Sequence, residues 1–129
     1  MGIPQDRWLP LNELRMTHEG RWESSVRIGA SSEWFSGHFD ECPLLPGVAL
    51  LALAAETVKR QGRQKGRLLE VSEFSSVRFR RLVFPGEELH ISVDAMPPGS
   101  EAKLDFQVTC HGNTVVLGVL KVAEELDGG

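Results

Sequence analysis

The stretch PGVALLALAAETVKRQG, residues 46–62, decides the fold of this chain. From Val48 to about Gln61 it predicts an α-helix, because apolar residues occupy most of the helical circumference. Pro46 suits the first turn, where a missing backbone N–H costs little, and Gly62 is typical of a helix end. A helix that is apolar on nearly all sides has to be enclosed by the rest of the chain.

Segments with the patterns of β-strands surround this helix. A strand is expected over 21–28, where Trp22 and Val26 fall on one face. Apolar and polar residues alternate in two of the later segments, so each buries one face. The later strands are expected over 68–83, 88–95, 102–110 and 114–122. The order of elements predicts an α+β fold, with an antiparallel sheet wrapped around one long buried helix.

Two segments before the helix are less regular. A short helix is expected over 9–16, following Pro10. The segment 29–45 contains glycine, proline and polar residues that argue against regular structure.

The size and charge of the chain limit its organisation and its partners. Its 129 residues with 41% hydrophobic content predict one domain over 1–129, and the net charge of -4 gives no general attraction to nucleic acid or anionic membranes. No apolar run approaches the roughly 20 residues that span a bilayer, and the N-terminal residues lack the apolar core of a secretory signal. A cytoplasmic protein is expected.

The two cysteines predict neither a metal site nor a disulfide. Cys42 and Cys110 lack metal-ligand spacing, and we expect both thiols to be reduced. Cys110 lies in an apolar alternation, which predicts a small core residue.

The most informative segment for chemistry is Phe35-Ser36-Gly37-His38-Phe39, which lies a few residues before the helix. Backbone N–H groups at a helix N-terminus stabilise an oxygen that gains negative charge. A nearby histidine transfers protons near neutral pH. Together these groups would polarise an acyl carbonyl and remove a proton from the adjacent carbon.

Two sequence blocks resemble a known family. The stretch GHFDECPLLPGV, residues 37–48, resembles the G-H-F-P-x-x-P-x-x-P-G-V signature of the 3-hydroxyacyl-acyl-carrier-protein dehydratases, whose fold is the hotdog. The stretch VRFRRLVFPGEEL, residues 77–89, is similar to that family's K-F-R-R-P-V-x-P-G-D-x-L block. The resemblance covers about 22–122 and implies a single hotdog domain that acts in fatty acid biosynthesis.

The resemblance also implies roles for individual residues. His38 would be the base at C2 of the acyl chain, and the amide of Gly47 would hold the thioester carbonyl. Phe39, Pro46 and Val48 would contact the substrate. The family builds its acyl site at a subunit interface, so a homodimer or higher homo-oligomer is expected. The substrate would be bound to acyl carrier protein or coenzyme A, and no metal or redox cofactor is expected.

One family residue is replaced in this chain. The resemblance places a glutamate or aspartate fourteen positions after the histidine, where this sequence has Ala52. Glu56 lies one turn further along the same helix face and is a candidate acid. Asp40 and Glu41, in the loop after His38, are further candidates, and a water could also donate the proton.

Three functions therefore remain open. The leading one is a 3-hydroxyacyl thioester dehydratase that eliminates water to give a 2-enoyl thioester. A hotdog thioesterase that uses Glu56 is the second. The third, suggested by Ala52, is a non-catalytic acyl-binding or accessory subunit of a hotdog heterodimer. A basic cluster after the helix would either dock an acidic carrier protein or keep the surface soluble; its members are Lys59, Arg60, Arg63, Lys65 and Arg67.

Overall fold

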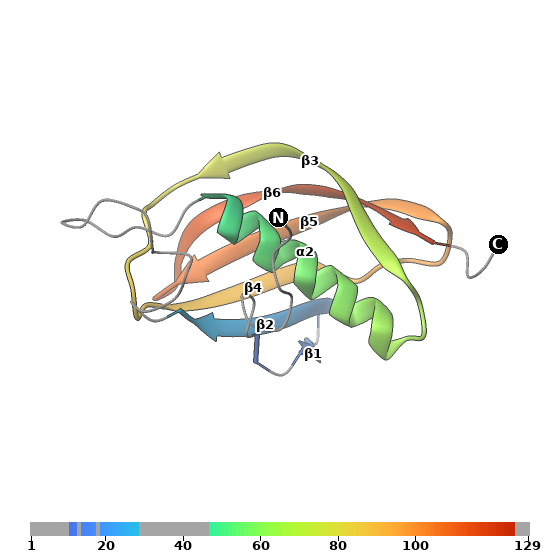
Figure 1. The fold of residues 1–129 in the computed structure, drawn as a ribbon, viewed down its shortest axis with the longest axis horizontal. Helices are drawn as coiled ribbons and strands as arrows, with labels where there is room; N and C mark the ends of the chain where they lie inside the picture. Colours follow the sequence, from blue (N-terminus) through green and yellow to red (C-terminus); the bar gives the residue numbers. More distant parts are fainter. Residues whose placement is uncertain (1–10, 13, 18, 29–46, 126–129) are drawn as a thin grey trace, which may run out of the picture.

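The computed structural model describes residues 11–12, 14–17, 19–28 and 47–125. Within these residues one helix packs against a six-stranded antiparallel sheet (Figure 1). The strand order is β1-β2-β4-β5-β6-β3. The elements are β1 (Arg15–Met16), β2 (Arg21–Arg27), α2 (Gly47–Gln64), β3 (Leu69–Phe79), β4 (Glu88–Asp94), β5 (Glu101–Cys110) and β6 (Asn113–Glu124). The predicted α+β architecture is confirmed.

Helix α2 lies across one face of the curved sheet (Figure 1). Leu50, Leu53, Ala54 and Val58 recur at helical spacing and are at most 3% exposed, so one stripe of the helix is buried in the core. Val48, at the start of the helix, is 62% exposed. The prediction that the helix is enclosed therefore holds along the stripe that faces the sheet, and not at Val48.

The end of α2 differs from the prediction. Gly62 does not end the helix, which continues to Gln64. Gly66 has a backbone φ of 71°, and its N–H donates to the carbonyl of Arg63. This left-handed glycine is the usual helix terminator. Gly62 is instead needed for close packing, because a Cβ there would lie 2.7 Å from the carbonyl oxygen of Arg67.

The strands bury alternate residues, as their sequences predict. On β4, the side chains of Leu89, Ile91 and Val93 are fully buried. Strand β5 buries the side chains of Leu104, Phe106, Val108 and Cys110, and strand β2 buries those of Trp22 and Val26. The prediction of Cys110 as a core residue is confirmed.

Two predictions of secondary structure were wrong, one in the type of element and one in its end. Arg15 and Met16, placed in a helix by the sequence, form strand β1 and pair with Glu23 and Trp22. Strand β3 ends at Phe79 rather than near residue 83. Its pairing with β6 shifts register twice, which bends the strand along the sheet edge. The strand therefore stops beside the first turn of α2.

Candidate functional site

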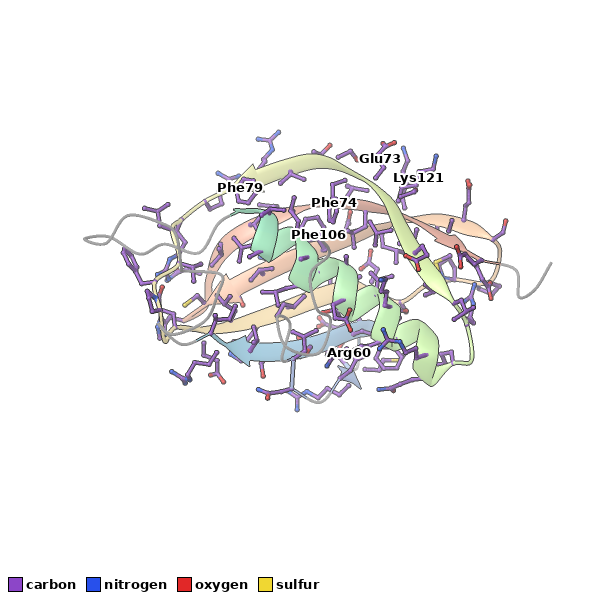
Figure 2. The ribbon with its side chains drawn as sticks, viewed as in Figure 1. Arg60, Glu73, Phe74, Phe79, Phe106 and Lys121 are labelled. Carbon is purple, nitrogen blue, oxygen red and sulfur yellow. The ribbon has the colours of Figure 1, made fainter. Side chains whose placement is uncertain are left out.

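The start of α2 and the end of β3 meet at Gly47. A Cβ on Gly47 would lie 3.0 Å from Cε1 and Cζ of Phe79. Such a contact is tighter than ordinary van der Waals packing, so the close approach of the ring favours glycine at this position. Figure 2 shows Phe79 next to the first turn of the helix.

Apolar side chains near this meeting point are exposed to solvent. Val48 is 62% exposed and Phe79 is 52% exposed. We call these two residues the apolar group. Leu82 and Phe84, which follow β3 in the chain, are 60% and 44% exposed. Large exposed apolar side chains that occur together mark binding surfaces for ligands or partner chains.

The N-terminus of α2 adds a polar feature to this surface. The first N–H groups of a helix have no acceptor within the helix, and the helix dipole gives that end a partial positive charge. The first turn of α2, from Gly47 to Leu50, contains no acidic residue. Donors at this position are therefore suited to an electron-rich oxygen of a ligand.

Glu56 lies further along the same helix. Its side chain is 3% exposed, and its Oε2 accepts a hydrogen bond from Nε of Arg60 at 3.0 Å. Nη2 of Arg63 lies 3.6 Å from the same oxygen. Both arginines follow Glu56 in sequence. Figure 2 shows Arg60 beside the C-terminal half of α2. The ion pairs therefore hold the carboxylate toward the C-terminal half of the helix.

The structure describes some of the predicted site residues, and others lie outside the described residues. Gly47 and Val48 lie together at the start of α2, whereas Glu56 lies nine residues later, about 13.5 Å along the helix axis. Ala52 lies between them, half-buried against the core. The predicted residues His38, Phe39, Asp40, Glu41 and Pro46 lie outside the described residues, so their predicted roles stay predictions.

The basic cluster after α2 is engaged within the chain. Lys59 pairs with Glu70, Arg67 pairs with Glu124, and Nζ of Lys65 lies 5.9 Å from the ring centroid of Trp22. The two remaining members, Arg60 and Arg63, pair with Glu56. These contacts are all made within the chain, and the two predicted roles of the cluster, docking an acidic carrier or keeping the surface soluble, stay predictions.

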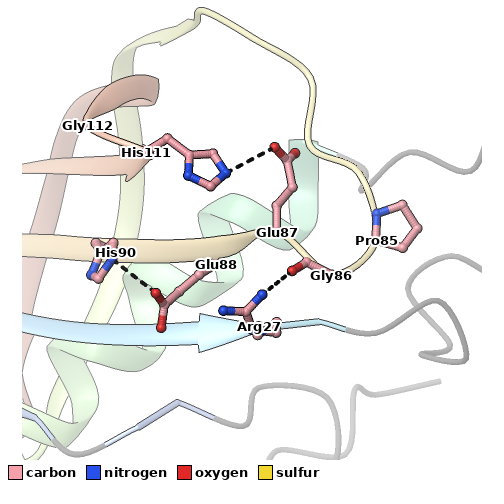
Figure 3. A pocket seen from close by; sticks show the side chains of 8 residues that line it. All are labelled: Arg27, Pro85, Gly86, Glu87, Glu88, His90, His111 and Gly112. Carbon is pink, nitrogen blue, oxygen red and sulfur yellow. Dashed lines mark hydrogen bonds and ion pairs between the residues drawn. The ribbon is translucent and has the colours of Figure 1, made fainter.

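A second polar cluster, which the sequence reasoning missed, lies at the turn between β5 and β6. Nη2 of Arg81 donates to Oε2 of Glu87 at 2.6 Å, and the backbone N–H of Phe84 donates to Oε1 at 2.8 Å. Sγ of Cys110 lies 3.6 Å from Oε2, and Nε2 of His111 lies 3.9 Å from it. Figure 3 shows Glu87 and His111 facing each other at a surface hollow.

The contacts within this cluster shift the pKa values of its members. The hydrogen bond from Phe84, helped by Arg81, lowers the pKa of Glu87. The hydrogen bond to Glu87 raises the pKa of Arg81, which is already high. Burial, and next the negative charge of Glu87, raise the pKa of the Cys110 thiol. The Arg81–Glu87 pair is therefore ionised near neutral pH, while Cys110 is a thiol.

Strand register explains why the sequence did not reveal this cluster. His90 on β4 pairs with Thr109 on β5 in antiparallel register. Residues just before His90 therefore lie beside those just after Thr109. The only sequence signal was that Arg81 and Glu87 both belong to the second motif block.

Comparison with known proteins identifies the family. A family model described as ApeI-like, ApeI dehydratase, matches residues 14–119. The chain belongs to the ApeI-like dehydratase family. A 3-hydroxyacyl-[acyl-carrier-protein] dehydratase FabZ of Bacillus licheniformis is 29% identical to this ApeI-like chain over 116 residues, which cover 81% of each sequence. The suspected relationship to the hotdog dehydratases is confirmed.

Solved structures confirm the fold. The dehydratase heterocomplex ApeI:P from Xenorhabdus doucetiae superimposes with a TM-score of 0.65 at 22% identity, covering 88% of this ApeI-like chain and 96% of that chain. A hypothetical thioesterase with coenzyme A from Streptococcus pneumoniae gives a TM-score of 0.68 at 13% identity, covering 88% and 84%. At such identities the likeness is one of fold, and the predicted hotdog fold is confirmed. No helix among the described residues has the length and apolarity to cross a membrane.

Proposed function

We propose that this protein is a dehydratase-like lyase that eliminates water from a 3-hydroxyacyl thioester and releases a 2-enoyl thioester. The acyl group would be carried on acyl carrier protein or coenzyme A. Family membership and the FabZ relative support dehydration as the reaction class. The observation that carries the proposal is the opening of α2 at Gly47, beside the exposed side chains of Val48 and Phe79.

The proposed reaction uses the N-terminus of α2 as an oxyanion site. The N–H of Gly47 would donate to the thioester oxygen, which gains negative charge when C2 loses its proton. His38 would accept that proton. The electron pair then forms the C2–C3 double bond, and the hydroxyl on C3 leaves with one proton as water.

The apolar group supports binding of the acyl chain. Val48 and Phe79 are more than half exposed, and they flank the N–H groups that would hold the carbonyl. In the proposal, Phe39 and Pro46 line the same pocket. Burying these side chains under an alkyl chain would be favourable by roughly 25 cal/mol for each Å² of apolar surface removed from water.

The acid that protonates the leaving hydroxyl is the open part of this mechanism. Ala52, at the position where the resemblance implies a carboxylate, has no proton to give. Glu56 is the candidate in the chain, but its carboxylate is bound by Arg60 and Arg63, about 13.5 Å along the helix from Gly47. A positioned proton transfer needs hydrogen-bond reach. This geometry favours a water as the acid over Glu56 of the same chain.

The site is proposed to lie at a subunit interface. Strand β3 is an edge strand of the sheet, and among the described residues it pairs only with β6. An unpaired strand edge that ends beside exposed apolar side chains is suited to a partner chain. We propose a homodimer, or a pair with another hotdog chain, that covers the apolar group and encloses the acyl site.

One specific observation favours a second candidate function. Ala52 cannot act as an acid, and one solved structure with this fold is a heterocomplex of dehydratase chains. The chain would then be an acyl-binding subunit that acts only with a second hotdog chain supplying the carboxylate. Dehydration by the mixture, and none by the pure protein, would favour this candidate.

The decisive assay uses the pure protein with a 3-hydroxyacyl thioester and follows formation of the enoyl product. We expect measurable elimination by the wild type and a loss of about 100-fold or more in His38→Ala, the scale of general base catalysis. Release of free thiol without an enoyl product would identify a thioesterase instead. If neither product forms and no acyl thioester binds, the proposed function is wrong.

A further inference from the structure

Three different metal-binding atoms meet at the turn between β5 and β6. They are a carboxylate oxygen of Glu87, Sγ of Cys110 and an imidazole nitrogen of His111, and all lie within 4.8 Å of one another. Oε2 of Glu87 is the common point, 3.6 Å from Sγ and 3.9 Å from Nε2 of His111. The sequence did not predict this group, because Glu87 lies 23 residues before Cys110, the neighbour of His111.

Two of the separations between these atoms can be compared with those around a tetrahedral zinc ion. With Zn–S near 2.3 Å and Zn–O near 2.1 Å, tetrahedral angles place a sulfur and an oxygen ligand about 3.6 Å apart. The Sγ–Oε2 distance is 3.6 Å. A nitrogen and an oxygen ligand would be about 3.4 Å apart, against 3.9 Å here. The His111 side chain is 70% exposed, which leaves the imidazole room to rotate toward the other two ligands when an ion binds.

The types of ligand select the metal. Thiolate and imidazole together favour zinc over magnesium or calcium, which prefer several oxygen ligands. Three protein ligands with one remaining position are typical of zinc sites that keep a water. The Glu87 carboxylate and a Cys110 thiolate would supply two negative charges, which face both the ion and the Arg81 cation already paired with Glu87.

We propose that Glu87, Cys110 and His111 bind a zinc ion, with water as the fourth ligand. The carboxylate is already held for this role, because the N–H of Phe84 fixes Oε1 and Arg81 fixes Oε2. Hydrogen bonds of this kind orient metal-binding carboxylates. Arg81 keeps its hydrogen bond to the ligating carboxylate as an outer partner, and Cys110 loses its proton when the ion binds.

The turn itself offers a matched variant. Cys110 pairs with Asn113 across a two-residue turn, in which His111 and Gly112 have φ values of 53° and 79°. Turns with two positive φ values prefer asparagine followed by glycine. His111→Asn therefore keeps the turn and removes the ligand. His90→Asn is the control, because His90 lines the same surface hollow but is not one of the three ligands.

The experiment titrates Zn²⁺ into metal-free protein by calorimetry and records the absorption spectrum with Co²⁺. All variants carry Cys42→Ser, so that Cys110 is the only thiol. We expect one zinc ion per chain and a sulfur-to-cobalt charge-transfer band. His111→Asn should weaken zinc binding by more than about 100-fold, beyond the cost of losing an outer-shell partner, whereas His90→Asn should bind like the parent protein. Cys110→Ala should abolish the cobalt band.

The outcomes separate a built site from adventitious binding. The proposal is overturned if the parent protein binds no zinc, or if His111→Asn binds zinc as tightly as the parent. It is also overturned if the cobalt spectrum of the parent lacks the thiolate band. Metal binding is the readout, so failure here leaves the proposed lyase activity untouched, and loss of that activity leaves the zinc proposal untouched.

Discussion

Replacing Glu56 by glutamine removes one buried negative charge while keeping the size of the side chain. Glu56 is 3% exposed and lies 3.0 Å from Arg60 and 3.6 Å from Arg63. Two unit charges 3 Å apart attract by about 5 kcal/mol at an effective dielectric constant of about 20, before the cost of removing them from water is subtracted. Glutamine keeps an oxygen that accepts a hydrogen bond from Arg60. We therefore expect Glu56→Gln to lower the free energy of unfolding by about 1–2 kcal/mol.

The assay combines urea unfolding with turnover per folded molecule. Glu70→Gln is the control for stability, because Glu70 is half-exposed and lies 3.8 Å from Lys59. Its loss should cost less than about 1 kcal/mol, the usual range for a surface ion pair. Turnover by Glu56→Gln should stay close to that of the wild type, since Glu56 is tied to the C-terminal half of α2.

The opposite pattern would refute this reasoning. Loss of a general acid lowers kcat by about 10²- to 10⁴-fold. If Glu56→Gln loses that much activity while its urea midpoint does not move, Glu56 is the acid, and the proposed role of water is wrong.

Three further predictions address the missing acid, the packing of the helix and the subunit interface. Ala52→Glu should raise the dehydration rate by about 10²-fold or more, and an unchanged rate would mean that position 52 does not face the substrate. Gly62→Ala should lower the free energy of unfolding by about 2 kcal/mol in urea titrations, because its Cβ would meet a backbone carbonyl at 2.7 Å; equal stability would contradict this packing. Phe79→Asp should dissociate the proposed dimer in sedimentation experiments, whereas Met16→Asp at the opposite sheet edge should not; a Phe79→Asp dimer would place the interface elsewhere.

Local patterns predicted most of the fold. The alternation at Leu89, Ile91 and Val93 fixed which face of β4 is buried, and that pattern depends only on neighbours in sequence. Arg15 and Met16 were harder, because two residues carry little periodicity and pair with β2 only in three dimensions.

Glycine was ambiguous for a related reason. The sequence predicted Gly62 as the helix end, but of Gly62 and Gly66 only Gly66 adopts a positive φ. Position 62 requires glycine because the chain after the helix packs against it. A Cβ there would lie 2.7 Å from Cγ of Leu69 and from the carbonyl oxygen of Arg67. That contact depends on how β3 leaves the helix, which no local pattern contains.

The candidate site also has a part that the sequence predicts and a part that it does not. Gly47 could be predicted as a helix opening because Pro46 and an apolar run mark it in the sequence. The ion pairs of Glu56 and the grouping of Glu87 with Cys110 and His111 depend on side-chain direction and strand register. Spacing along the chain does not encode either of these.

The position of β3 has a consequence for how the chain folds. Strands β5 and β6 form a local hairpin, whereas β3 joins the sheet by pairing Leu69 with Glu124, residues far apart in sequence. Closing so long a loop is entropically costly, so contacts of this kind form late and slow the folding reaction. We expect the hairpin to protect its amides from hydrogen exchange first during refolding, and β3 to gain protection last. The surface proposed to recruit a partner would therefore be completed only at the end of folding.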